Sequence, residues 1–180
     1  MAYHLRPARA DETDALCTLI QASMRGLSQT DYSAEQIEGA LQGACSLDRQ
    51  LIDDGTYFVV EDDHHRLAGC GGWSYRRTLF GGDNYAVREP ESLDPACDAA
   101  KIRAFFIHPD HARRGLAQMI YQTCESEAKR HGFTRLELMS TLPGLAFYRE
   151  LGFVGETQIN TELPNGSSIP FVPMSKDLSN

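Results

Sequence analysis

The chain has 180 residues, enough for one domain whose hydrophobic core needs neither disulfides nor a structural metal. Its 25 acidic side chains outnumber its 17 Lys and Arg, and the net charge of -8 argues against a protein that coats nucleic acid. The first residues do not resemble a signal peptide, and no apolar run approaches the roughly 20 residues of a membrane helix. We therefore expect a cytoplasmic protein with no nucleic-acid or membrane partner.

The cysteines and histidines do not form a recognisable metal or disulfide pattern. The five cysteines are scattered without a CxxC pair, which predicts buried thiols in a reducing compartment. Two histidine pairs, at 64–65 and at 108 and 111, lie in or beside acidic turns, but neither pair has a complete ligand set with metal-site spacing. We expect no metal.

The first half of the chain alternates short extended and helical segments. In chain order the predicted elements are a strand at 3–7, a helix at 11–23, a helix from Ser33, and strands at 57–60 and 67–75. Ser33 and Gln36 have the spacing of a capping box, which marks a helix start. The glycines Gly69, Gly71 and Gly72 inside the last strand indicate a bulge or a close approach to the backbone.

The second half begins with a long excursion at 78–99, of a length that tends to be functional or mobile. The predicted elements that follow are a strand at 102–107, a turn at 108–110, a helix that stops at 131–132, a strand at 136–139, a short helix at 143–151, and a hairpin of 154–161 with 168–174. Pro170 and Pro173 mark the last strand as a candidate edge strand. We predict one mixed α/β domain over residues 1–180.

The strand at 102–107 leads through a turn into a helix that opens on Gly115. A helix N-terminus offers unpaired N–H groups and a partial positive charge, so it can seat a phosphate. Gly115 and Ala117 leave room for a pyrophosphate to approach the backbone. Arg113 and Arg114 in a first helical turn oppose the helix dipole, unless an anion is bound there. By itself this element is equally compatible with two arginines that point into solvent.

Tyr148 lies near the end of the short helix at 143–151. A buried tyrosine hydroxyl usually needs a hydrogen-bond partner. A phenol of reference pKa about 10 stays protonated at neutral pH and can donate a proton to a leaving thiolate of reference pKa about 8.5. Alone, the residue is better explained by packing of the helix on a sheet than by catalysis.

Together, at this spacing, these two segments resemble the GNAT superfamily of N-acetyltransferases. The resemblance implies a single GNAT-like domain: a central, mostly antiparallel twisted sheet that splays at the acyl-CoA site, with helices on both faces. It implies that the coenzyme is bound by Phe105, Phe106, Ile107, Arg113, Arg114, Gly115, Leu116, Ala117 and Gln118. It also implies that Tyr148 is the general acid for the departing coenzyme A thiolate.

Two positions depart from the family pattern. Ala112 stands where the pattern places a polar residue, but backbone amides do most of the holding, so we expect binding to survive. Thr141 replaces an asparagine often found before the tyrosine, which keeps a hydroxyl but loses an amide contact to the pantetheine.

The resemblance implies acetyl transfer from acetyl-CoA to a primary amine of a small molecule by direct attack. The oxyanion would be stabilised by a backbone N–H such as that of Ile107. Glu61, Glu137 and Asp98 are conceivable bases, but each is more readily a solvated or edge carboxylate, so no base is assigned. A non-catalytic acyl-CoA sensor and an acetyltransferase for protein N-termini or lysines remain alternative functions.

The acceptor is not identified by the sequence. The excursion at 78–99 is rich in acids, which favours a cationic amine: Asp83, Glu89, Glu91, Asp94 and Asp98. A homodimer through an edge strand or through this excursion is compatible with the sequence.

Overall fold

The computed structural model describes residues 2–178 and contains one seven-stranded sheet in the order β1-β2-β3-β4-β5-β7-β6. The strands are β1 (Tyr3–Pro7), β2 (Tyr57–Asp62), β3 (Leu67–Ser74), β4 (Ala100–Ile107), β5 (Arg135–Thr141), β6 (Ile159–Glu162) and β7 (Ser168–Asp177). Every neighbouring pair is antiparallel except β4 with β5, which run parallel. The predicted mixed α/β fold with a mostly antiparallel sheet is confirmed.

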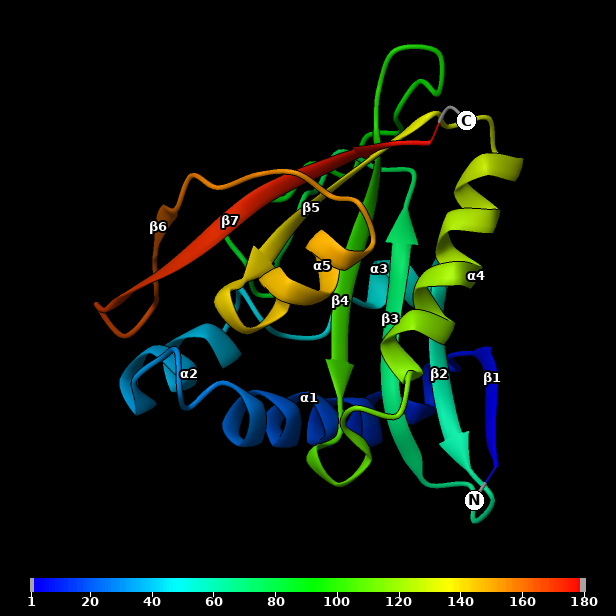
Figure 1. Cartoon of the computed structure of the whole chain (residues 1–180). Helices are drawn as coiled ribbons and strands as arrows, with labels where there is room; N and C mark the ends of the chain where they lie inside the picture. The colour runs from blue at the N-terminus through cyan, green and yellow to red at the C-terminus, as the bar shows by residue number, and fades with distance from the viewer. Residues whose placement is uncertain (1, 179–180) are drawn as a thin grey trace.

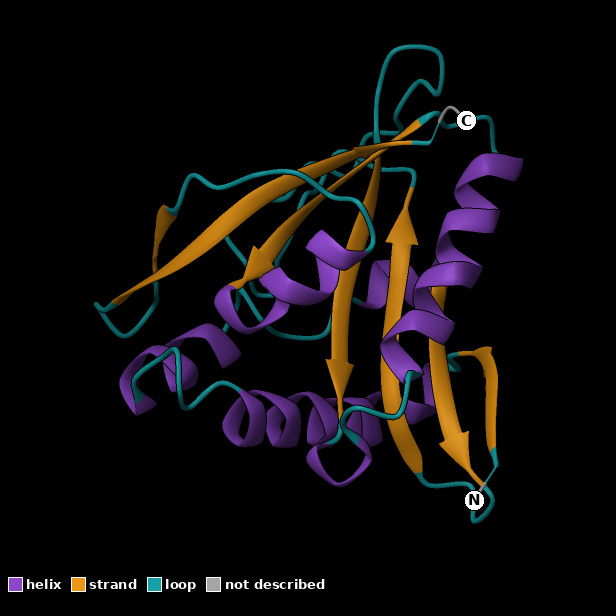
Figure 2. Ribbon diagram, in the orientation of Figure 1, coloured by secondary structure: helices purple, strands orange, loops and turns teal. Residues whose placement is uncertain are grey.

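Helices cover both faces of the sheet (Figures 1 and 2). They are α1 (Thr13–Leu27), α2 (Ala34–Leu41), α3 (Arg49–Asp53), α4 (Leu116–Arg130) and α5 (Leu145–Glu150), with short 3-10 turns at Ala10–Glu12, Pro109–His111 and Leu142–Gly144. Helices α4 and α5 pack with one buried cluster, and α1, α2 and α3 pack with a second cluster on the opposite face. None of the described helices is long and apolar enough to cross a membrane.

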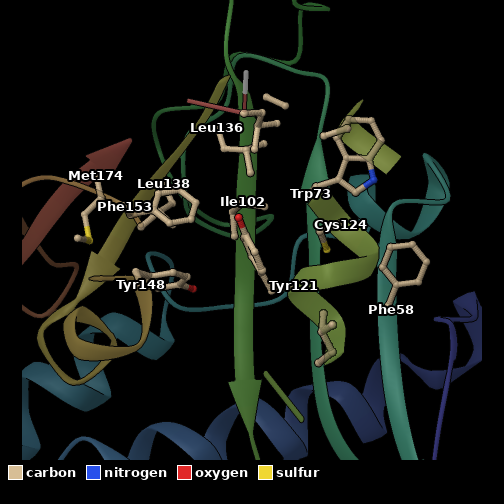
Figure 3. Close-up of a cluster of buried hydrophobic side chains, with 14 of the residues drawn as sticks. Phe58, Trp73, Ile102, Tyr121, Cys124, Leu136, Leu138, Tyr148, Phe153 and Met174 are labelled. Carbon is tan, nitrogen blue, oxygen red and sulfur yellow. The ribbon is translucent and has the colours of Figure 1, made fainter. Parts of the chain in front are cut away.

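The aromatic side chains of the α4/α5 face join the two helices to the sheet (Figure 3). Tyr148 of α5 contacts Phe153 with ring centroids 5.7 Å apart, and Phe153 contacts Tyr121 of α4 at 5.9 Å. Leu138 of β5 and Ile102 of β4 lie in the same buried cluster. The cluster therefore fixes α5 against the two strands that border the site described below.

Helix starts follow local side-chain chemistry. Ser33 caps α2 as predicted: its Oγ accepts from the Gln36 N–H at 3.1 Å, and its own N–H donates to Gln36 Oε1 at 2.9 Å. Helix α3 was missed, because it is only five residues long and has little periodicity. Its start is nevertheless marked by Asp48, whose carboxylate accepts from the Gln50 N–H at 3.0 Å.

The prediction that the last strand is an edge strand is wrong. Strand β7 lies between β5 and β6, and β6 is the edge. The ladder with β6 ends at Phe171, so Pro173 lies beyond it and its missing N–H removes no bond to that strand. The predicted turn of the hairpin is present, with Gly166 at φ 84°.

The cysteines are free thiols, as their spacing indicated, but their burial differs from the prediction. Cys45, Cys70 and Cys124 are buried, Cys17 is half-buried and Cys97 is exposed. Among the described residues, no group of three or more His, Cys, Asp or Glu side chains gathers as a metal site.

Candidate active site

A β-bulge bends strand β4 in the middle of the sheet. The register with β3 shifts between Cys70 and Gly72, so that β4 carries one extra residue there. Ala104 adopts a left-handed φ of 55°, which is uncommon for a residue with a Cβ. Its carbonyl accepts a hydrogen bond from the buried Tyr57 hydroxyl at 2.8 Å. This bond helps to hold an otherwise unfavourable backbone conformation.

The glycines of β3 make room for this bulge. A Cβ built on Gly71 would lie 2.5 Å from the Phe105 ring, and one on Gly69 would lie 2.7 Å from Ile107 Cδ1. A side chain at either position would therefore displace the β4 residues that face the site. Both predicted alternatives for these glycines, a bulge and a close approach, are confirmed.

Strands β4 and β5 separate just after they pair. Their parallel ladder is limited to Ala100 with Leu136 and Lys101 with Glu137. The Lys101 ammonium lies 2.5 Å from the Glu137 carboxylate and ties the strands together at this end. From Ile102 onward β4 diverges from β5, and Figure 1 shows the gap with α5 lying over it. The predicted splay is present.

A cleft of about 700 Å³ runs through this gap. Its lining includes Leu116 and Tyr148 from the α4/α5 face of the sheet, and Met24, Cys45 and Phe171 from the α1/α2 face. The cleft therefore crosses the sheet, so that two ligands can approach from opposite faces.

The cleft brings together the residues that the sequence singled out, with one exception. Those that line it are Phe105, Phe106, Ile107, Arg113, Gly115, Leu116, Ala117, Gln118 and Tyr148. Arg114 is absent from the lining; its guanidinium lies 3.4 Å from the carbonyl oxygen of Asp110. The two departures from the family pattern, Ala112 and Thr141, also line the cleft.

Unpaired amides of α4 form one end of the cleft. The first described hydrogen bond into this helix runs from the Met119 N–H to the Gly115 carbonyl at 3.0 Å, so the amides just before Met119 have no described acceptor. Gly115 has φ 79°, and a Cβ there would meet nothing within 4 Å. The arrangement has the chemistry of a phosphate cradle.

The two arginines precede the helix, which corrects one step of the sequence argument. Gly115 is the N-cap of α4, so Arg113 and Arg114 lie outside its first turn and do not oppose its dipole from within. Arg113 has a left-handed φ of 60° and lines the cleft. Only this arginine is placed to face an anion at the helix start.

Tyr148 lies on α5 where the cleft meets the α4/α5 core. Its side chain is buried among aromatic rings, with the Phe105 ring centroid at 6.4 Å and that of Phe147 at 5.1 Å. Burial raises the pKa of the Tyr148 phenol above its ordinary value, because the charged phenolate is poorly solvated there. The hydroxyl is therefore held in its proton-donating form.

The N–H of Ile107 already has a partner. It donates to Oγ of Ser23, a buried residue of α1 that also lines the cleft, at 3.1 Å. The expectation that this amide is free to stabilise an oxyanion is therefore not supported by the structure. Ser23 lies over 80 positions away in the sequence, and no local pattern could have indicated the contact.

The far end of the cleft is walled by the excursion between β3 and β4. Leu79, Phe80 and Gly81 line it. Arg103 of β4 fixes both ends of this segment, because it donates to the carbonyls of Thr78 at 3.2 Å and Gly81 at 2.7 Å. This part of the excursion is therefore anchored to the sheet.

Arg103 in turn is paired with Asp48, the residue that caps α3. The guanidinium lies 2.9 Å from the carboxylate, and each side chain is only 2% exposed. Asp48 also accepts from Arg88, whose second nitrogen donates to the carbonyl of Gly82. This network joins α3, β4 and the excursion, and it was not predicted because its members are far apart in sequence.

The acids of the excursion do not line the cleft, contrary to the expectation that they form a cationic-amine site. Asp83 lies 3.5 Å from Arg49 and Asp98 lies 3.8 Å from Arg77. Among the described lining residues the only acid is Glu150, which is exposed on α5.

The carboxylates considered as bases are likewise engaged elsewhere. Glu61 contacts Arg6 and His65 on the β1/β2 side of the sheet, and Glu137 pairs with Lys101. With Asp98 they all lie outside the cleft lining, so none is placed to accept a proton from a ligand in the cleft.

Comparison with known proteins agrees with this architecture. The family model of the Acetyltransferase (GNAT) family matches residues 15–153. A GCN5-related N-acetyltransferase structure from Rhodopseudomonas palustris is 18% identical, with a TM-score of 0.72 over 99% of this chain and 97% of that one. The PaiA N-acetyltransferase of Thermoplasma acidophilum, in complex with coenzyme A, is 15% identical, with a TM-score of 0.65 over 98% and 99%. The yncA protein of Salmonella typhimurium, solved with its cofactor acetyl-CoA, is 16% identical, with a TM-score of 0.61 over 100% and 96%.

Proposed function

Because this chain belongs to the GNAT family of acetyltransferases, we propose that it transfers an acetyl group from acetyl-CoA to a primary amine of a small molecule. The observation that carries the proposal is the cleft that crosses the sheet between β4 and β5. One end offers the unpaired amides around Gly115 to a diphosphate, and the other end leaves space for an acceptor. The coenzyme would run along β4, from Ile107 to Phe105.

Direct attack by the amine is favoured over an acyl-enzyme. Cys45 is the only cysteine among the described lining residues, and burial raises the pKa of its thiol to about 12. A thiol in this state is a poor nucleophile at neutral pH. The amine lone pair would form the new C–N bond, and the thioester C–S bond would break with its electron pair on sulfur.

Tyr148 would supply the proton that the departing sulfur needs. The thiolate takes the phenolic proton, Tyr148 is reprotonated from water, and the surplus proton on nitrogen leaves to solvent. Burial of Tyr148 makes the phenol a weaker acid, and the same surroundings also disfavour a naked thiolate, so the proton would be donated as the C–S bond breaks. Holding both reactants in one cleft contributes much of the rate.

The walls of the cleft support a small acceptor over a protein one. The acceptor end is bounded by Phe80, whose ring contacts Tyr85 and Phe171 at 4.8 and 5.7 Å. An open and shallow groove, as a protein segment requires, would lack this wall.

The test is a calorimetric titration with acetyl-CoA, followed by thiol release across a panel of primary amines and mass spectrometry of the products. We expect binding, amine-dependent thiol release and an N-acetyl product. Binding without thiol release from any amine would indicate the sensor function instead. Failure to bind acetyl-CoA at millimolar concentration would refute the coenzyme site itself.

A further inference from the structure

The acceptor end of the cleft has an unusual chemical character for a site that handles amines. Its side chains on the α1/α2 face of the sheet are mostly apolar: Met24, Cys45, Leu79, Phe80, Met139 and Phe171. The polar groups there include serine hydroxyls from α1 and from the 44–46 segment and the hydroxyl of Thr141. No acidic side chain among the described residues lines this end, because Glu150 lies on α5 on the opposite face.

Among the described residues, the charged side chain that lines this end is not available to a ligand. Arg103 lines the cleft, but its guanidinium pairs with Asp48 and donates to the carbonyls of Thr78 and Gly81. The Arg103 side chain is only 2% exposed. A charged group on the acceptor, of either sign, would therefore exchange its water for hydroxyls of the lining and find no available opposite charge among the described residues there. The cost of burying an unpaired charge is several kcal/mol.

From these observations we infer that the acceptor is a primary amine carried on an apolar alkyl or aromatic body with no second charged group. The inference rests on the proposed transferase function and specifies its substrate class. Polyamines and amino acids are excluded as preferred acceptors, because their second charge would be stranded among Met24, Phe80 and Phe171.

The same surroundings explain how the amine could be activated without an assigned base. Only the neutral amine can attack the thioester, and an apolar environment disfavours the ammonium form. The acceptor end would therefore promote loss of the proton as the amine enters. A carboxylate at this end would act in the opposite direction, because it would stabilise the ammonium.

The experiment compares matched acceptors in an acetyl-CoA thiol-release assay. Pentylamine is paired with cadaverine, which adds a second ammonium, and phenethylamine is paired with phenylalanine, which adds a carboxylate. A tenfold change in kcat/KM corresponds to about 1.4 kcal/mol, and burying the second charge costs more than this. We therefore expect kcat/KM to be more than about tenfold higher for the member of each pair that lacks the second charged group. Preference for cadaverine or phenylalanine overturns the inference and leaves the transferase function intact. If neither pentylamine nor phenethylamine releases thiol while charged amines of the wider panel do, the inference fails; if no amine of the panel does, the proposed function fails.

A variant tests the role of the lining directly. Leu79 is half-buried, lines the cleft and belongs to neither of the two core clusters formed by the described residues, so replacing it should not disturb folding. Leu79→Glu should raise the cadaverine to pentylamine ratio of kcat/KM, since it supplies a partner for the second ammonium. Leu79→Gln, of equal size, should not raise it, and neither should Val87→Glu, which adds the same charge at an exposed position outside the lining. An unchanged ratio in Leu79→Glu, with acetyl-CoA affinity retained, would contradict the inference.

Discussion

The Tyr57 hydroxyl donates a hydrogen bond of 2.8 Å to the carbonyl of Ala104, the residue of the β4 bulge with a left-handed φ of 55°. Tyr57 is a buried residue of β2, where it pairs with Gly72 of β3. The bond couples the core under the sheet to the strand whose bend opens the cleft. The shape of the site therefore depends on a residue, Tyr57, that does not line it.

Tyr57→Phe should weaken both the fold and the coenzyme site. Loss of one buried hydrogen bond, which leaves the Ala104 carbonyl unpaired, should lower the free energy of unfolding by about 1–3 kcal/mol. We also expect weaker acetyl-CoA binding, because the bulge is less firmly held. Urea denaturation and calorimetry measure the two effects. Tyr121→Phe, which removes a hydroxyl that contacts Lys176 and not β4, is the control; equal loss of acetyl-CoA affinity in both variants would refute the coupling.

Gly115→Ala tests the phosphate cradle. Both Gly115 and Gly55 have left-handed φ values, of 79° and 72°, and a Cβ at either would meet nothing within 4 Å. The conformational cost of alanine should therefore be similar, about 1–2 kcal/mol. Only Gly115 lines the cleft, so Gly115→Ala alone should reduce acetyl-CoA affinity, as calorimetry would measure. An equal reduction in Gly55→Ala would show that the loss comes from backbone strain and not from the site.

Tyr148→Phe should separate chemistry from binding. Without the phenolic proton the thiolate must leave unprotonated, and we expect kcat to fall by about 10²-fold or more while acetyl-CoA affinity is nearly unchanged. Steady-state thiol release and calorimetry give the two quantities. Undiminished kcat would remove Tyr148 from the mechanism.

The pH dependence of kcat should also reflect the role of Tyr148 as a proton donor. Burial raises the pKa of Tyr148, so its donating form persists as pH rises, and its ionisation should not reduce kcat below pH about 10. An aromatic amine that is uncharged at neutral pH keeps the acceptor's own titration out of the profile. A decline in kcat between pH about 8 and 9 that disappears in Tyr148→Phe would contradict the raised pKa.

The Asp48–Arg103 pair should be asymmetric in its effect on stability. Asp48→Asn leaves the Arg103 guanidinium buried without its carboxylate and should cost about 3–5 kcal/mol. Arg103→Met should cost less, because Asp48 keeps its contact with Arg88. Denaturation of both single variants and of the double variant measures the coupling, which we expect to exceed about 1 kcal/mol. Strict additivity would show that the pair is not a unit.

Local chemistry allowed much of the fold to be predicted from the sequence. The Ser33 cap, the turn at Gly166 and the periodicity of α4 each depend on residues within a few positions of one another, so a single segment suffices to predict them. Neither Gly115 nor Tyr148 was assigned a role by its own segment; the roles came from the family resemblance of the two segments together. Both residues line the cleft, and their roles stay predictions.

Contacts between residues that are remote in sequence could be identified only from the tertiary structure. The burial of Arg103 against Asp48, the capture of the Ile107 N–H by Ser23, and the distance of the excursion's acids from the cleft all join residues that are remote in sequence. The position of β7 inside the sheet is of the same kind, since an edge is a property of neighbours and not of composition. Charge could be counted from the sequence, but whether a charge faces a ligand or a partner depends on which distant side chain the fold brings beside it.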